Sequence, residues 1–219
     1  MKFIFQRIKT WTTANHILYR NYFRLFKPDL FSYLPNNNTD LFISSFPRSG
    51  NDYAKQLTKN YNSELRISSH FHKVGAFKLA LSLGIPVVSI IREPIECISS
   101  SMVKYKEELK LKDYPTYPIF NYLFFHKALL KYSSKIMIVS FNDLIEDPSH
   151  YFSRLENELK IKNNISIEEL DFIVDKVKNK LNNSNLNHNK IDALKKGPDH
   201  GKELLKSEAK EIICQNKKM

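Results

Sequence analysis

The sequence predicts an α/β fold, a three-layer α/β/α arrangement in which helices cover both faces of a mainly parallel central sheet. Short apolar segments, typical of buried strands, alternate along the chain with segments whose apolar residues recur at helical spacing. The run from Pro86 to Ile91 is almost wholly apolar, as expected for a strand that is covered on both faces. With 42% hydrophobic residues in 219, the chain can build a core, which excludes wholesale disorder.

Residues 1–39 are predicted to form an amphipathic helix and a linker, and residues 40–219 the main domain. Apolar and basic side chains alternate at helical spacing between residues 2 and 27. Such a helix either packs on the domain with its basic face in water or lies on an anionic membrane surface. We prefer the packed helix and keep peripheral membrane contact through residues 2–27 as the alternative. The prolines and asparagines of residues 28–38 mark a loop.

The remaining elements are justified by their apolar patterns. In chain order we expect strands over residues 41–46, 65–69, 86–91 and 136–139. Tyr53, Leu57 and Tyr61 recur every four residues and predict a helix from Asp52. Further helices are expected over residues 73–83, from about Pro94, from Pro148 to about Lys160, and over most of 167–215.

The charge balance favours an anionic partner. There are 34 Lys and Arg residues against 23 Asp and Glu, a formal net charge of +11. Cys97 and Cys214 cannot form a disulfide framework, and neither has a neighbour at zinc-ligand spacing. No segment reaches the ~18 apolar residues that a bilayer requires, and the N-terminus does not resemble a signal peptide. We therefore expect a cytoplasmic protein, with any peripheral contact at the inner membrane face.

The turn after the first strand is the first candidate site. Phe46-Pro47-Arg48-Ser49-Gly50-Asn51-Asp52-Tyr53 joins a strand to a helix start, where free backbone N–H groups and the helix dipole attract anions. Arg48 adds a charged fork, Ser49 a hydroxyl, and Gly50 a close backbone approach. The turn is not a Walker A loop. The alternative is a plain turn capped by Ser49 or Asn51.

Two other places carry suitable cations. Arg92 ends a buried strand, at the edge where open α/β sheets bind ligands, and Ser100 lies about two helical turns later. The alternative for Arg92 is a surface ion pair with a nearby acid. Near the C-terminus, Lys195, Lys196 and Gly197 could reach an anion, or could form a solvated loop.

Together these segments resemble the sulfotransferases that use 3′-phosphoadenosine-5′-phosphosulfate (PAPS), whose fold is P-loop NTPase-like. Residues 46–51 resemble the loop that binds the 5′-phosphosulfate, and Arg92-Glu93-Pro94 through Ser100 resembles the strand and helix that bind the 3′-phosphate. Residues 138–148 resemble a later strand and turn, and Lys195-Lys196-Gly197 resembles the loop that closes over the cofactor. The resemblance covers residues 40–212 in the family's order.

The resemblance implies a role for each matching residue. Arg48, Ser49, Gly50 and Asn51 would hold the 5′-phosphosulfate. Asp52 stands where the family often has a threonine, and Tyr53 where a tryptophan stacks on adenine. The 3′-phosphate would be held by Arg92, Ser100, Lys195, Lys196 and Gly197. No metal is expected, because these cations can neutralise the anion.

The general base implied by the family is a histidine between the first loop and the Arg92 strand. We choose His70, which follows the second strand 22 residues before Arg92, and keep His72 as the alternative; a structural role at the strand end is also open. Ser68 stands where many members have a lysine.

The expected function is therefore transfer of a sulfuryl group from PAPS to an acceptor hydroxyl, with Arg48 stabilising the leaving phosphate. The aromatic segment 106–132 would line the acceptor side, and the resemblance suggests a glycan acceptor. The alternatives are a nucleotide phosphotransferase of related fold, an inactive binding relative, or a basic protein that binds nucleic acid or a membrane surface without catalysis.

Overall fold

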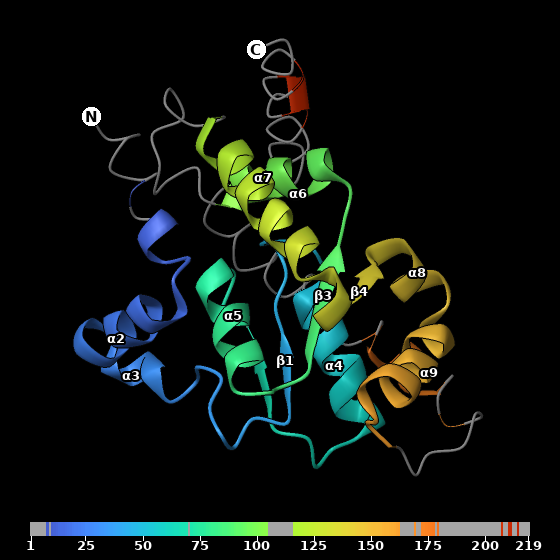
Figure 1. Cartoon of the computed structure of the whole chain (residues 1–219). Helices are drawn as coiled ribbons and strands as arrows, with labels where there is room; N and C mark the ends of the chain where they lie inside the picture. Colours follow the sequence, from blue (N-terminus) through green and yellow to red (C-terminus); the bar gives the residue numbers. More distant parts are fainter. Residues whose placement is uncertain are drawn as a thin grey trace, which may run out of the picture.

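The computed structural model describes residues 8, 10–69, 71–104, 116–162, 169, 172–177, 179, 207, 210, 211 and 214. Strands and helices alternate along this part of the chain (Figure 1). The strands are β1 (Leu41–Ile43), β2 (Ile67–Ser69), β3 (Val87–Ile91) and β4 (Met137–Ser140). The helices are α2 (His16–Phe26), α3 (Pro28–Phe31), α4 (Asn51–Tyr61), α5 (Val74–Ser82), α6 (Pro94–Lys104), α7 (Thr116–Lys131), the 3₁₀-helix η2 (Ser133–Lys135), α8 (Phe141–Glu146) and α9 (Pro148–Leu159).

The four strands form one sheet in the order β2-β1-β3-β4, and every pair of neighbours is parallel. Ile43 is in register with Ser69 on one side and with Val88 on the other. A parallel pair needs a crossover, and the intervening helices supply it. The predicted α/β class with a parallel central sheet is confirmed.

Helices cover both faces of this sheet because successive strand residues point to opposite sides. Phe42 and Val87 point into a core shared with α2, α5, α6 and α7. Leu41, Ile43 and Val88 point into a second core shared with α4, α8 and α9. The three-layer arrangement follows from these two cores.

The N-terminal segment departs from the predicted continuous helix. Residues 13–15 form a turn and bend, and α2 begins after it with Asn15 as its cap. The Asn15 side chain accepts hydrogen bonds from the backbone N–H groups of Ile17 (2.9 Å) and Leu18 (3.2 Å). An asparagine competes well with a continuing helix because it satisfies the free N–H groups of the next one. A short helix, α3, also stands where a loop was expected.

The α2 helix packs on α5, as the preferred interpretation expected. Tyr19 is buried in the core beside α5, and the Gly75 N–H donates to the Thr13 carbonyl at 3.1 Å. A Cβ atom on Gly75 would lie 2.2 Å from that carbonyl oxygen, so glycine allows the close approach. The domain division at residue 39 stays a prediction. No helix in the described part of the chain is both long and apolar enough to cross a membrane.

The α7 helix has no counterpart among the predicted elements. Its sequence is apolar almost all round, so it lacks the one-sided stripe by which a surface helix is found. Phe125 and Leu129 are buried, whereas Leu123 and Leu130 are 63% and 72% exposed. Because apolar residues lie on both the buried and the exposed side of α7, the sequence shows no apolar pattern at helical spacing there.

Candidate functional site

All four strands are parallel, so their carboxyl ends lie along one side of the sheet, here the carboxyl edge. Three loops therefore meet there: residues 44–50 after β1, Arg92 and Glu93 after β3, and the start of α8 after β4. The chain leaves β1 for α4 on one face and leaves β3 for α6 on the other face. The gap between such diverging loops is where open α/β sheets bind ligands.

The loop after β1 is anchored to β3 by both backbone and side chain. The Ser44 N–H donates to the Val88 carbonyl at 2.9 Å, and the buried Ser45 hydroxyl accepts the Ile90 N–H at 2.6 Å. The Ser45 hydroxyl thus accepts the hydrogen bond that a backbone carbonyl would accept if β1 continued. The strand consequently ends at Ile43, and the chain can turn away without leaving the Ile90 N–H unpaired.

The turn itself has two residues in the left-handed region, Arg48 (φ 69°) and Gly50 (φ 99°). Glycine adopts this conformation freely, but for Arg48 it costs ~1–2 kcal/mol. A Cβ atom on Gly50 would also lie 2.5 Å from the Phe141 ring. Strain of this kind is found at functional sites, where surrounding contacts hold it in place.

The first turn of α4 has no side-chain cap, because Gly50 stands at the cap position and offers none. The backbone N–H groups at the start of an uncapped helix, with the positive end of its dipole, form an anion site. Asp52 is exposed in this first turn, where the dipole favours an acid. The helix start therefore has free backbone N–H groups at the predicted place, and anion binding there stays a prediction.

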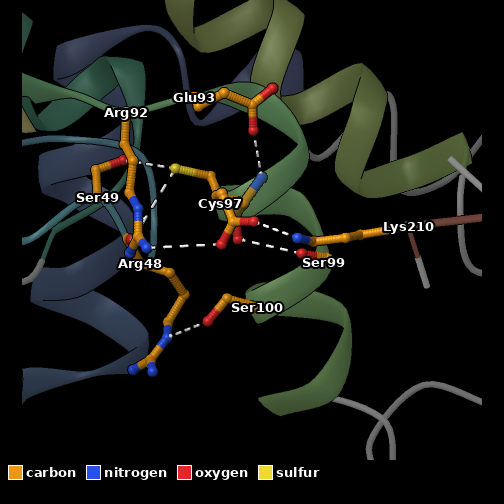
Figure 2. Close-up of polar contacts among 9 residues, drawn as sticks. Arg48, Ser49, Arg92, Glu93, Cys97, Ser99, Ser100 and Lys210 are labelled. Atoms are coloured by element: carbon orange, nitrogen blue, oxygen red, sulfur yellow. Dashed lines mark hydrogen bonds and ion pairs between the residues drawn. The ribbon is translucent and has the colours of Figure 1, made fainter. Parts of the chain in front are cut away.

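Three residues predicted to bind phosphate meet at this turn. Arg48 Nε donates to Ser100 Oγ at 3.0 Å, and Arg92 Nη1 donates to the Arg48 carbonyl at 3.2 Å (Figure 2). These residues come from the β1 loop, the end of β3 and α6. The fold therefore brings the two predicted phosphate sites into direct contact.

Arg92 is held from two further sides. Its guanidinium lies over the Phe141 ring, 4.5 Å from the ring centroid, and 3.7 Å from the Glu96 carboxylate. Glu96 in turn pairs with Lys210, which comes from the C-terminal part of the chain. The ion pair that was the alternative interpretation of Arg92 is present, at a length and exposure typical of weak pairs. Only the fold brings the Phe141 ring beside Arg92 and Lys210 beside Glu96, because both contacts join segments far apart in the sequence.

Ser49 points inward and not to solvent. Its side chain is fully buried, and its hydroxyl lies 3.2 Å from the Cys97 sulfur (Figure 2). Burial raises the pKa of the Cys97 thiol above its ordinary value. A neutral thiol beneath the turn supports the Ser49 side chain without adding negative charge to the anion site.

His72 lies behind the turn, against Asn51. Its Nδ1 atom is 2.8 Å from the Ser45 carbonyl oxygen and 3.2 Å from the Asn51 side-chain nitrogen. Since a carbonyl can only accept, Nδ1 carries the proton and Nε2 is the basic nitrogen. The Asn51 amide oxygen is buried without a hydrogen-bond partner, and turning that amide over would bring the oxygen toward Nδ1–H. The preferred base, His70, lies outside the described residues and stays a prediction.

The other predicted residues are placed as follows. Tyr53 is 8% exposed and packs in the core beside Leu57, so its ring is largely enclosed in protein. Its role against adenine stays a prediction. The Ser68 hydroxyl donates to the Tyr33 carbonyl at 2.7 Å and not toward the turn. Lys195, Lys196 and Gly197 lie outside the described residues.

The predicted acceptor side is represented by the aromatic residues of α7. The Tyr122 ring packs edge-on against Phe46 at 5.0 Å, and its hydroxyl donates to the Arg92 carbonyl at 3.1 Å. Burial raises the pKa of Tyr122 to about 12. His126 stacks on Tyr122 at 3.9 Å, with its Nε2 atom buried and unpaired, and burial lowers its pKa. These rings back the turn and carry no charge near neutral pH.

No protein-family model matches the chain, and no curated protein matches it. Among solved structures, the chain is similar to the crystal structure of mouse sulfotransferase SULT7A1 complexed with PAP. The two are 14% identical, with a TM-score of 0.47, over 68% of this chain and 67% of that one.

Proposed function

We propose that the protein is a sulfotransferase that moves a sulfuryl group from PAPS to an acceptor hydroxyl. The observation that carries the proposal is the contact of Arg48 with Ser100 and of Arg92 with the Arg48 carbonyl. A donor with phosphate at both its 5′ and 3′ positions needs two anion sites in one crevice. The predicted 5′ site and the predicted 3′ site share these hydrogen bonds.

The turn after β1 would hold the 5′-phosphosulfate. The uncapped N–H groups of α4 and the Arg48 guanidinium can share its charge, and no described carboxylate forms an ion pair with Arg48. Negative charge grows on the bridging oxygen as the sulfur leaves it. Arg48 should therefore matter more in the transition state than in the bound complex. Arg48→Ala is expected to lower kcat more than it weakens donor binding.

Arg92 and Ser100 would hold the 3′-phosphate. Arg92 already faces the carboxylate of Glu96, and a phosphate can take the place of that distant partner. Lys195, Lys196 and Gly197 would complete the site from the C-terminal part of the chain.

In the reaction, a histidine takes the proton of the acceptor hydroxyl while the acceptor oxygen forms a bond to sulfur. The bond between sulfur and the bridging oxygen of the 5′-phosphate breaks, and the products are a sulfate ester and 3′,5′-ADP. His70 is the base that the family resemblance favours. His72 is the described candidate, with its basic Nε2 fixed by the Nδ1–H contact to Ser45.

The proposal is tested by incubating the chain with PAPS and a panel of sugars and phenols. Sulfated product and an equal amount of 3′,5′-ADP, measured by mass spectrometry, are the expected result. ATP is the parallel donor, because a phosphotransferase would consume it and leave PAPS intact. Arg66→Ala is the matched control, since that arginine lies at the opposite edge of the sheet. Product from ATP alone, or from neither donor, would refute the proposal.

A further inference from the structure

The outer surface of α2 and α3, here the N-terminal surface, exposes large apolar side chains that no part of the described fold covers. Helices α2 and α3 lie outside α5 at the margin of the molecule (Figure 1). The apolar members of this surface, on α2, on α3 and directly after α3, and their exposed fractions are Ile17 58%, Leu18 53%, Leu25 71%, Phe26 68%, Leu30 45% and Tyr33 67%. Single exposed apolar residues are ordinary, but a group of them in one short stretch of chain marks an interaction surface.

Folding does not require these side chains, because α2 already has a packed face. Tyr19 is 3% exposed, and Phe23 meets Phe71 edge-on at 5.5 Å. Leu18 and Leu25 are seven residues apart and therefore share one side of the helix, turned away from Tyr19. The helix is apolar on its inner side and again on part of its outer side.

Basic side chains lie directly beside these apolar residues. Arg20 and Arg24, four residues apart, form a row with Ile17, which lies three residues before Arg20, and Lys27 follows at the end of α2. The α2 segment contains no acidic residue. None of the three forms an ion pair with another described residue. The long aliphatic stems of such residues can lie along apolar material while their charged ends reach outward.

We propose that the N-terminal surface docks on a lipid bilayer that carries anionic headgroups. Apolar side chains would enter the boundary between headgroups and acyl chains, and the three cations would meet lipid phosphates. The same charges disfavour a second copy of the chain as occupant, because a twofold contact would bring the arginine rows together. This proposal does not depend on the sulfotransferase assignment, since it uses no residue of the anion site.

The test measures binding of the full chain to vesicles of phosphatidylcholine with phosphatidylserine, and to vesicles of phosphatidylcholine alone, by co-sedimentation. We expect binding to the anionic vesicles, weakened by salt, and little to the neutral ones. Replacing both Arg20 and Arg24 by Gln should weaken it about 25-fold, at about fivefold per basic side chain. Leu25→Asp should weaken it at least about tenfold.

Leu130→Asp is the matched control, because Leu130 on α7 is 72% exposed against 71% for Leu25. It should leave vesicle binding unchanged, and each variant should keep the wild-type melting temperature and affinity for 3′,5′-ADP. Equal losses in the Leu25 and Leu130 variants would overturn the assignment to this surface. Absence of vesicle binding would also overturn it, and a dimer in light scattering that Leu25→Asp dissociates would identify a second copy as the occupant.

Discussion

Cations near the amino ends of the strands (the amino edge) have different partners from cations near their carboxyl ends (the carboxyl edge). At the amino edge, Arg66 meets Asp40 through two hydrogen bonds of 2.7 and 2.9 Å, and the guanidinium lowers the pKa of Asp40 to about 2. Lys59 donates there to the carbonyls of Ser63 and Leu65. At the carboxyl edge, Arg48 meets a neutral hydroxyl, and Arg92 meets a carbonyl and a carboxylate 3.7 Å away.

The difference separates cations that complete the fold from cations that remain available to a ligand. An arginine with a bidentate carboxylate has its charge compensated and its donors occupied. An arginine that bonds a hydroxyl keeps its charge, and a phosphate can replace the hydroxyl with a gain in energy. The amino edge therefore provides matched controls, Arg66 for Arg92 and Gly84 for Gly50.

The largest expected effect concerns the base. His70→Ala should lower turnover by ~10²–10⁴-fold while 3′,5′-ADP affinity and melting temperature stay unchanged. His72→Ala should cost far less if His70 is the base, and the same large factor if the role belongs to His72. A transfer assay on both variants decides between them. Full activity in both would mean that neither histidine accepts the proton.

Gly50 at the carboxyl edge and Gly84 at the amino edge both have positive φ, and their alanine variants compare how tightly the two places are packed. Gly84 (φ 70°), before β3 at the amino edge, has open space where a Cβ atom would lie, whereas at Gly50 that atom would meet the Phe141 ring at 2.5 Å. Gly84→Ala should cost ~1–2 kcal/mol of unfolding free energy from backbone strain alone. Gly50→Ala should cost a further ~1–3 kcal/mol for overpacking. Urea denaturation measures both, and equal losses would contradict the tight contact.

Arg92→Ala should remove most of the preference for 3′,5′-ADP over 5′-AMP. A charge-assisted hydrogen bond is worth ~1.5–3 kcal/mol, or roughly 10- to 150-fold in affinity. Arg66→Ala, at the amino edge, should leave that preference intact. If calorimetry shows that Arg92→Ala and Arg66→Ala change this preference equally, Arg92 is no more available to a ligand than Arg66.

The smallest effect concerns pH. Burial lowers the pKa of His126 in the folded protein below its unfolded value, so its contribution to stability is present above that value. The contribution is lost as pH falls from that value toward the lower folded pKa, because the unfolded chain accepts a proton that the buried imidazole does not. The melting temperature should fall between pH 7 and pH 5, and that of His126→Phe should fall less. An unchanged slope in the variant would show that His126 is not responsible.

Much of the fold could be predicted because strands and helix starts are local features. Short apolar segments located three of the strands, the alternating Leu65 and Ile67 located β2, and the proline at residue 94 marked the start of α6. The predicted ends were less accurate. β1 ends at Ile43 and not at Phe46, because Ser45 replaces backbone pairing with a side-chain hydrogen bond.

The candidate site was predictable only in part. Arg48 lies in the turn after β1, Arg92 directly follows β3, and Ser100 lies about two turns into α6, so their patterns could be found in the sequence. Two supporting residues could not be found, because Phe141 and Cys97 matter only through long-range contacts that the fold creates. The left-handed conformation of Arg48 was also hidden, since the flanking Gly50 offered an ordinary explanation for the turn.

The most direct test of the central claim is calorimetric titration of the chain with 3′,5′-ADP, 5′-AMP and ATP at one salt concentration. The account predicts that 3′,5′-ADP binds most tightly, because it assigns the 5′-phosphate to Arg48 and the 3′-phosphate to Arg92, both at the carboxyl edge. Equal affinities for 3′,5′-ADP and 5′-AMP would contradict it, and a preference for ATP would indicate phosphoryl transfer instead.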